Sequence, residues 1–205
     1  MDRHDLSRAP ELLHTARLTL HAPRPEFGPL FVESLNRSLP GLRYICWAQK
    51  ARDANWGVDF MSKGRDYVAA GEDLIYCAFE RQPAGSSALG AYVGRIDLHS
   101  WDFSVPRCEI GYVGDVLSAG RGLMREAALA CVQLAFDLGA VRVQALSEAG
   151  NTRALHFAQH ALGFTREGEL RHYERDAQGR LGTQVMFAAI KAEAPPLKRA
   201  EPGLA

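Results

Sequence analysis

The 205-residue sequence has no long apolar run and no surplus of charge of either sign. No uninterrupted apolar stretch approaches the roughly 18–20 residues of a membrane-spanning helix. The first residues, Met1–Asp5, also lack the apolar run of a signal peptide. Lysine plus arginine and aspartate plus glutamate each number 24, so the formal net charge is zero. Because binding to a phosphate backbone needs a basic surplus, we expect neither a nucleic acid nor a membrane as partner.

Cysteine is scarce and scattered. The sequence contains no CxxC pair, and each of its four cysteines lies inside an apolar pattern: Cys46, Cys77, Cys108 and Cys131. This usage favours reduced thiols buried in the core of a cytoplasmic protein. Two histidines, His156 and His160, have the spacing of a helical zinc pair, but no third ligand accompanies them. We therefore expect no metal site.

The hydrophobic pattern predicts one α+β domain. A strand over 18–22 precedes two helical stretches, 27–35 and 51–70. Three strand-like runs with short links follow, as in an antiparallel meander: 74–80, 89–98 and 107–113. A helix over 123–138 then leads to a strand over 141–145, and such a crossover makes these last two strands parallel neighbours. The remaining predicted elements are a helix over 151–160 and hairpin strands over 170–175 and 183–189.

The most informative stretch is the strand from Glu109 to Val113 and the loop Gly120-Arg121-Gly122 that opens the long helix. Glycine lets a backbone approach a ligand closely, and the first N–H groups of a helix point into the same space. With the positive end of the helix dipole behind them, they predict an anion site, most simply for a phosphate. A Gly-x-Gly pair alone is equally compatible with a plain tight turn. Neither a Walker loop nor a dinucleotide fingerprint is present.

Three motifs in this order resemble the GNAT superfamily of acyl-CoA N-acyltransferases: Glu109-Ile110-Gly111-Tyr112, residues 120–127, and Asn151-Thr152-Arg153-Ala154 ahead of residues 162–164. The resemblance runs from about residue 15 to 190. It looks closest to the ribosomal-protein alanine and serine N-terminal acetyltransferases, which residues 15–20 also resemble. It implies a mixed, mostly antiparallel sheet with a splayed central parallel strand pair, flanked by helices. Residues 1–14 would form an N-terminal extension, 15–190 the acetyltransferase domain and 191–205 a flexible tail.

The resemblance further implies acetyl-CoA as co-substrate and no metal. The pantetheine arm would pair with the strand at Tyr112 and Val113, and the diphosphate would lie on main-chain amides of the glycine loop. At Leu117 the family pattern has Arg or Gln; the difference removes one polar contact but leaves the backbone cradle. The implied cofactor-binding residues are Tyr112, Val113, Ser118, Ala119, Gly120, Arg121, Gly122, Leu123, Met124 and Asn151.

Glu109 is a candidate general base, because the resembling family has a carboxylate at the matching place. An amine must lose a proton before it attacks a thioester. An α-amino group with a pKa of about 7.7–8 does so far more readily than lysine at about 10.4. A modest base therefore suffices for an N-terminal amine. The strand amide near Tyr112 would polarise the thioester carbonyl. The alternative is that Glu109 only faces solvent.

The proton donor for the leaving thiolate is not evident. Related enzymes use a serine or tyrosine on the helix after the second parallel strand. Counting from Asn151 gives Ala154 at that place, and counting back from Phe164 gives Leu155. The stretch looks one residue longer than usual, which predicts an irregular helix. The open substitutes are Ser147, Thr152 and Tyr173, or no donor at all.

The acceptor site has four candidate residues: Trp47, Asp97, His99 and Tyr173. Asp97 and His99 share one face of a strand by alternation, although that face could also be solvent. No residue combines a nucleophile with a base, so we expect direct attack without an acyl-enzyme. The acceptor is a protein N-terminus or a small amine such as an aminoglycoside, a polyamine or an amino-acid derivative. A weakly catalytic CoA-binding sensor is a third alternative, and the protein is a monomer or a homodimer.

Overall fold

The computed structural model describes residues 1–83, 85–86, 88–176, 178–193 and 201–202. Its described strands form one mixed sheet in the order β7-β8-β6-β5-β4-β3-β2-β1-β9, in which only β5 and β6 are parallel. The strands are β1 Leu12–His14, β2 Leu18–His21, β3 Leu74–Glu80, β4 Tyr92–Asp102, β5 Arg107–Gly114, β6 Arg142–Glu148, β7 Thr165–Arg175, β8 Leu181–Ile190 and β9 Glu201–Pro202. The predicted α+β class with a mostly antiparallel sheet is confirmed.

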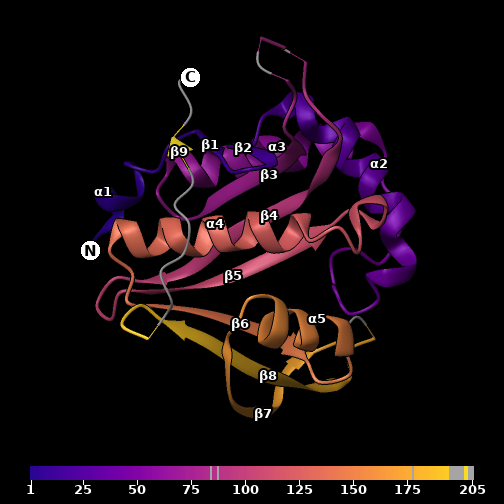
Figure 1. The fold of residues 1–205 in the computed structure, drawn as a ribbon. Coiled ribbons are helices and arrows are strands. Elements are labelled where there is room, and N and C mark those ends of the chain that lie inside the picture. Colours follow the sequence, from indigo (N-terminus) through magenta and orange to yellow (C-terminus); the bar gives the residue numbers. More distant parts are fainter. Residues whose placement is uncertain (84, 87, 177, 194–200, 203–205) are drawn as a thin grey trace.

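Helices flank the sheet (Figure 1). The α-helices are α1 Arg3–Leu6, α2 Gly28–Ser38, α3 Ala54–Ala69, α4 Leu123–Leu138 and α5 Thr152–His156. The described residues also contain short turns next to these helices, the 3-10 turns η1 Pro25–Phe27, η2 Leu39–Gly41 and η3 Val116–Ser118 and the π-helical turn η4 Phe157–Ala161. Helix α4 runs across one face of the sheet, and it ends at Gly139 in the left-handed conformation, as the sequence predicts.

Strand β3 is buried on both faces, which explains its continuous apolar sequence. Tyr76 and Ala78 belong to the large core under α4. Their neighbours Cys77 and Phe79 point the other way and pack with Phe27 and other aromatic side chains from the α2–α3 layer. The two cores therefore hold the sheet between α4 on one side and α2 with α3 on the other.

The parallel pair β5–β6 separates partway along its length. Its register runs from Arg107 opposite Arg142 to Glu109 opposite Gln144 and then stops. Beyond that point β5 continues to pair with β4 as far as Gly114, while β6 continues to pair with β8. The predicted splay of the central strands is confirmed, and Glu109 marks the place where the gap begins.

Several segments differ from the sequence-based expectation. Residues 1–14 include helix α1 and strand β1, and the latter pairs with β2. Most of the tail over 191–205 lies outside the described residues, but β9 adds two residues to the edge of β1. Strand β7 begins at Thr165 rather than at residue 170. Cys46 is exposed, in contrast to the other three cysteines, so the prediction that it lies in the core is wrong.

Candidate active site

A cleft of about 990 Å³ lies where β5 and β6 separate. Strands β4, β5 and β6 supply its floor, and one wall comes from the segment 43–49 that precedes α3. The hairpin of β7 and β8 supplies the opposite wall, and α5 contributes Asn151 and Ala154. The cleft brings together the predicted residues Trp47, Asp97, His99, Glu109, Tyr112, Val113, Asn151 and Tyr173. The glycine loop over 118–124 does not line this cleft and lies farther along the gap.

Glu109 is held at the closed end of the gap, where the β5–β6 pairing stops. Its side chain is 18% exposed, and Gln144 Nε2 donates a hydrogen bond of 3.5 Å to its Oε2. His99 Nε2 lies 4.0 Å from its Oε1. Burial raises the pKa of this carboxyl group above its usual value, against the opposing effect of His99. A carboxylate with a raised pKa at the floor of a cleft is a better proton acceptor than an ordinary surface glutamate.

Asp97 and His99 project from β4 on the face that carries Glu109. Arg95 pairs with Asp97 Oδ1, and His99 Nε2 lies 3.5 Å from Asp97 Oδ2. Arg95 also lies over the ring of Phe60, with 5.3 Å between the guanidinium carbon and the ring centroid. Strand alternation could have placed Arg95 beside Asp97 from the sequence alone. The negative charge of Asp97 is therefore balanced within the protein.

Aromatic side chains form the outer wall of the cleft. Trp47 is 36% exposed, and its ring centroid lies 5.4 Å from that of Phe60. Tyr44 also lines the cleft, with Arg43 above its ring. Tyr173 stands on the opposite hairpin and is 56% exposed. Because Trp47 and Tyr173 are exposed on its two walls, the cleft is open to solvent and an extended ligand can enter it.

The amide of Tyr112 faces the gap between the strands. The Asp115 amide donates to the carbonyl of Val93 on β4 at 2.8 Å. The register between β4 and β5 is regular from Gly94 to His99. Because N–H directions alternate along a strand, the Tyr112 N–H points away from β4, toward β6. This strand stretch is past the last β5–β6 pair, so its β6 side is free for a ligand.

The Tyr112 side chain leaves β5 on the face opposite Glu109. Its ring centroid lies 4.7 Å from that of Phe157 in the π-helical turn. Its hydroxyl is buried and has no hydrogen-bond partner among the described residues. Burial raises the pKa of this phenol to about 12, so the hydroxyl keeps its proton well above neutral pH. A buried, unpaired donor at the edge of a cleft is suited to a ligand acceptor.

The helix after β6 is irregular, as the length of that stretch predicts. Asn151 caps α5, since its Oδ1 accepts from the Ala154 amide at 3.2 Å. The chain then passes into a π-helical turn that the Leu162 amide closes on the Phe157 carbonyl at 2.9 Å. Among the substitute donors, Ser147 lines the cleft and is 9% exposed. Tyr173 lines the cleft too, but it is exposed, and Thr152 is not among the lining residues.

The glycine loop presents a row of unused main-chain amides. Gly120 and Gly122 both have positive φ, +76° and +72°, and Gly122 begins α4 without a side-chain cap. Within the described residues no hydrogen bond uses the amides of residues 120–125; the first helical bond runs from the Glu126 amide to the Gly122 carbonyl. Free amides at the positive end of a helix are suited to bind an anion.

The first two residues of the predicted cradle are engaged within the chain. The amides of Ser118 and Ala119 donate to the carbonyls of Asp115 and Val116 in the 3-10 turn η3. Asp115 itself is buried, caps this turn and pairs with Arg37 of α2 at 2.8 Å. The loop is thus fixed at its beginning, and the amides open to a ligand start at Gly120 rather than at residue 118.

Gln144 and Glu174 are among the cleft residues that the sequence did not predict. Gln144 on β6 contacts Glu109, and Glu174 on β7 accepts a hydrogen bond of 3.2 Å from Gln184 on β8. Their positions depend on the register of strands distant in sequence, for which the local pattern holds no signal. The residues that the structure describes include no cluster of three or more possible metal ligands. No helix among them has the length and apolarity needed to span a membrane.

The sequence and the fold were compared with known proteins. The acetyltransferase (GNAT) domain family matches residues 17–165. No curated protein sequence matches the chain.

Among solved structures, a microcin self-immunity acetyltransferase in complex with acetyl-CoA and AMP is 18% identical; the match covers 86% of this chain and 93% of the other, with a TM-score of 0.76. A Salmonella typhimurium acetyltransferase that modifies the N-terminal serine of a ribosomal protein is 17% identical; the match covers 86% of this chain and 96% of the other, with a TM-score of 0.73. A ribosomal-protein α-N-acetyltransferase in complex with coenzyme A is 18% identical; the match covers 86% of this chain and 95% of the other, with a TM-score of 0.74.

At these identities the likeness to solved structures concerns the fold alone, whereas the match to the acetyltransferase (GNAT) domain family covers most of the chain. The chain therefore belongs to the GNAT acetyltransferase family.

Proposed function

We propose that this enzyme transfers an acetyl group from acetyl-CoA to the α-amino group of a protein or peptide N-terminus. The observation that carries the proposal is the position of Glu109. This half-buried carboxylate stands where β5 and β6 separate, at the floor of an open cleft. The thioester would lie in the gap, the diphosphate would lie on the amides of 120–124, and Asn151 would contact the cofactor. The acceptor would enter over Trp47 and Tyr173.

The reaction joins the amine nitrogen to the thioester carbon and breaks the carbon–sulfur bond. Glu109, directly or through a water, takes the proton that the amine loses. The Tyr112 amide, which points into the gap, stabilises the negative charge on the carbonyl oxygen. Because Glu109 and the Tyr112 hydroxyl lie on opposite faces of β5, the amine would approach from one face and the thiolate would leave toward the other. The proton on Glu109 then returns through water to the product thiolate.

The Tyr112 hydroxyl serves in this scheme as a hydrogen-bond donor to the departing sulfur. A thiol has a pKa of about 8.5, whereas burial raises the pKa of Tyr112 to about 12. Full transfer of the phenol proton to a thiolate would therefore be unfavourable by more than about a thousandfold. A hydrogen bond stabilises the thiolate without that cost. The side chain thus replaces the donor that is missing at Ala154.

An α-amine fits the cleft better than a polycation does. The lining contains Asp97, Glu109, Glu148, Glu174 and Asp176 beside Arg43, Arg95, Arg175 and Arg180. Arg95 and Arg180 already pair with Asp97 and Asp176, so the cleft has no large acidic surplus. A single half-buried carboxylate is enough for an amine with a pKa near 8. The open cleft also leaves room for the chain that follows an N-terminal residue.

The test is release of free thiol from acetyl-CoA in the presence of a panel of amines at equal concentration. The panel contains peptides with N-terminal serine or alanine, the same peptides with a blocked N-terminus and free lysine, a polyamine and an aminoglycoside. Turnover with free N-termini alone supports the proposal. Preferred turnover of the polyamine or the aminoglycoside would replace it with a small-molecule acetyltransferase. Tight coenzyme A binding without turnover of any amine would favour a sensor.

The direct route is tested separately, because Cys46 is a thiol in the wall of the cleft. Cys108 is buried on the core side of β5 and cannot reach a substrate. Direct attack predicts that Cys46→Ala keeps the rate within about twofold and that mass spectrometry finds no acetylated enzyme after mixing with acetyl-CoA alone. An acetyl group on Cys46 that is passed to the amine would establish a covalent route instead.

A further inference from the structure

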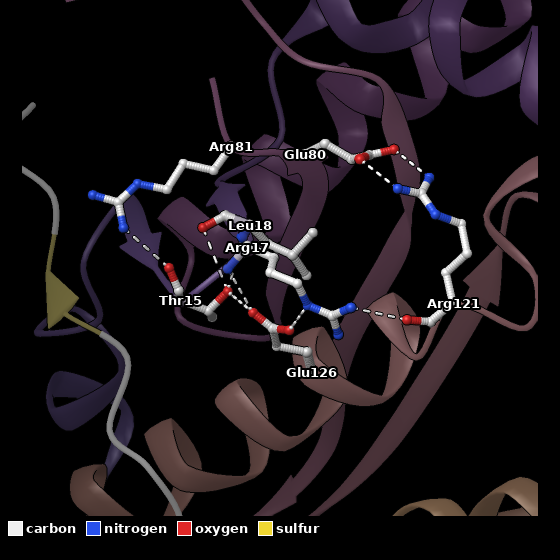
Figure 2. Close-up of polar contacts among 7 residues, drawn as sticks. All are labelled: Thr15, Arg17, Leu18, Glu80, Arg81, Arg121 and Glu126. Atoms are coloured by element: carbon white, nitrogen blue, oxygen red, sulfur yellow. Dashed lines mark hydrogen bonds and ion pairs between the residues drawn. The ribbon is translucent and has the colours of Figure 1, made fainter. Parts of the chain in front are cut away.

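A network of charged contacts fastens the glycine loop to the first strands of the sheet (Figure 2). Glu126, in the first turn of α4, accepts hydrogen bonds from Thr15 Oγ1 at 2.6 Å, the Arg17 amide at 2.8 Å and Arg17 Nε at 2.7 Å. Arg17 Nη1 donates to the carbonyl of Arg121 inside the loop at 2.9 Å. Arg17 thus connects the start of β2 with the loop and with the first turn of α4.

The second arginine of the network is turned away from the loop. Arg121 binds both carboxylate oxygens of Glu80 at the end of β3, at 2.5 and 2.7 Å. Both terminal nitrogens of its guanidinium group are therefore used within the protein. Arg17 differs, because its Nη2 has no partner among the described residues. A Cβ atom on Gly122 would lie 3.6 Å from this nitrogen, so Arg17 Nη2 lies beside the backbone that carries the free amides.

Arg17 compensates the negative charge that Glu126 places in the first turn of α4. Burial raises the pKa of Glu126, but the hydrogen bonds from Thr15 and Arg17 outweigh it and leave the pKa lower than usual, so the group is charged at pH 7. A negative charge in the first turn suits the helix dipole, but it repels an anion bound at the same helix end. The Arg17 guanidinium at 2.7 Å offsets that charge. The site is then left with the free amides and one unused cationic N–H group.

We propose that Arg17 is a positioning and anion-binding residue of the diphosphate site, which holds the Arg121 carbonyl so that the loop amides face outward and offers its Nη2 to the diphosphate. This inference rests on the proposed placement of the diphosphate on residues 120–124. It concerns the cofactor alone and is independent of the identity of the acceptor. It also gives a role to the start of β2, whose sequence otherwise shows only a strand edge.

The test compares acetyl-CoA with S-acetylpantetheine, a thioester that lacks the diphosphate. Arg17→Met removes the charge and the hydrogen bonds but keeps an apolar stem. Loss of one charge-assisted hydrogen bond should raise KM for acetyl-CoA about tenfold or more, with kcat changed less than about twofold. The value of kcat/KM for S-acetylpantetheine should be unchanged. The double variant Arg17→Met with Glu126→Gln should recover part of the acetyl-CoA affinity, because the uncompensated carboxylate is gone.

Arg81→Met is the matched control. Arg81 Nη1 donates to the Thr15 carbonyl at 3.2 Å, so the control removes an equal charge from the same network without a contact to the loop. This control should leave kcat/KM unchanged for both thioesters. Equal losses of kcat/KM for both thioesters in Arg17→Met would mean a purely structural role and would overturn the inference. An unchanged KM for acetyl-CoA would overturn it as well. Calorimetry with coenzyme A distinguishes failure of the inference about Arg17 from failure of the proposed function. If the parent protein does not bind coenzyme A, the proposed function itself is refuted.

Discussion

Substitution of Gly122 by alanine tests whether the amides of the glycine loop bind the cofactor. Gly122 has φ of +72°, and a Cβ atom placed on it would meet only Arg17 Nη2, at an ordinary contact distance of 3.6 Å. The protein's own packing therefore permits alanine. The cost lies in the backbone, because an L-residue in the left-handed region is strained by about 1–2 kcal/mol. In a domain of this size, such a loss lowers Tm by about 2–8 °C.

Gly163 supplies the matched control. It has a similar φ of +74° and nothing within 4 Å of an added Cβ, but it follows the π-helical turn and lies outside the loop. Gly163→Ala should therefore lose a similar amount of stability with no change in cofactor affinity. In Gly122→Ala, relief of the strain would turn the neighbouring amides away from a bound diphosphate. Its Kd for coenzyme A should rise about tenfold, the equivalent of about 1.4 kcal/mol.

Thermal unfolding gives the two Tm values, and isothermal titration with coenzyme A gives the two affinities. We expect similar losses of Tm in the two variants and unequal losses of affinity for coenzyme A. Equal affinities in the two variants would show that the diphosphate is bound elsewhere. A much larger loss of Tm in Gly122→Ala would show that the loop contributes chiefly to folding.

Three further predictions concern the catalytic groups and the core. Glu109→Gln should lower kcat about a hundredfold or more at neutral pH with little change in acetyl-CoA affinity, and an unaltered rate would remove Glu109 from the mechanism. Because burial raises the pKa of Glu109 above 4.5, its ionisation lowers the stability of the folded state as the pH rises through this window. The variant should therefore unfold at a higher Tm than the parent at pH 7 and lose that advantage below pH 4.5, which calorimetry across pH would check. Tyr112→Phe should lower kcat about tenfold and leave coenzyme A binding intact; loss of binding would assign the hydroxyl to affinity instead. Phe79→Ala, at a fully buried position of β3, should cost about 3–5 kcal/mol in urea unfolding, and a loss below about 1 kcal/mol would contradict the two-sided burial of β3.

The elements with strong local signals could be predicted closely from the sequence. Helix α4 begins and ends where its apolar spacing and Gly139 indicate, and β3 has the predicted bounds because it is apolar throughout. Strand β1 could not be predicted, since three residues show no alternation and are held in place by pairing with β2. Its existence depends on a partner rather than on its own sequence.

The candidate site likewise contains residues that local sequence features predict and residues that they do not. Glu109 and the loop amides follow from local features, namely a strand, two glycines and a helix end. Other polar residues of the cleft do not, because Gln144 reaches Glu109 across the β5–β6 register and Glu174 joins the cleft lining through the β7–β8 hairpin. The loop sequence also gives no partner for the Arg121 side chain, which Glu80 binds from a distant strand. Long-range pairing decided each of these positions.

The π-helical turn over Phe157–Ala161 has a consequence for how related sequences are aligned. It accommodates one extra residue, so counting from Asn151 and counting back from Phe164 cannot agree, and a gap belongs inside the turn. Deleting one residue there would restore regular winding. The ring of Phe157, the first residue of this turn, packs against the Tyr112 ring, with 4.7 Å between the centroids. The turn that absorbs the extra residue therefore also supplies the contact that holds the phenol in place.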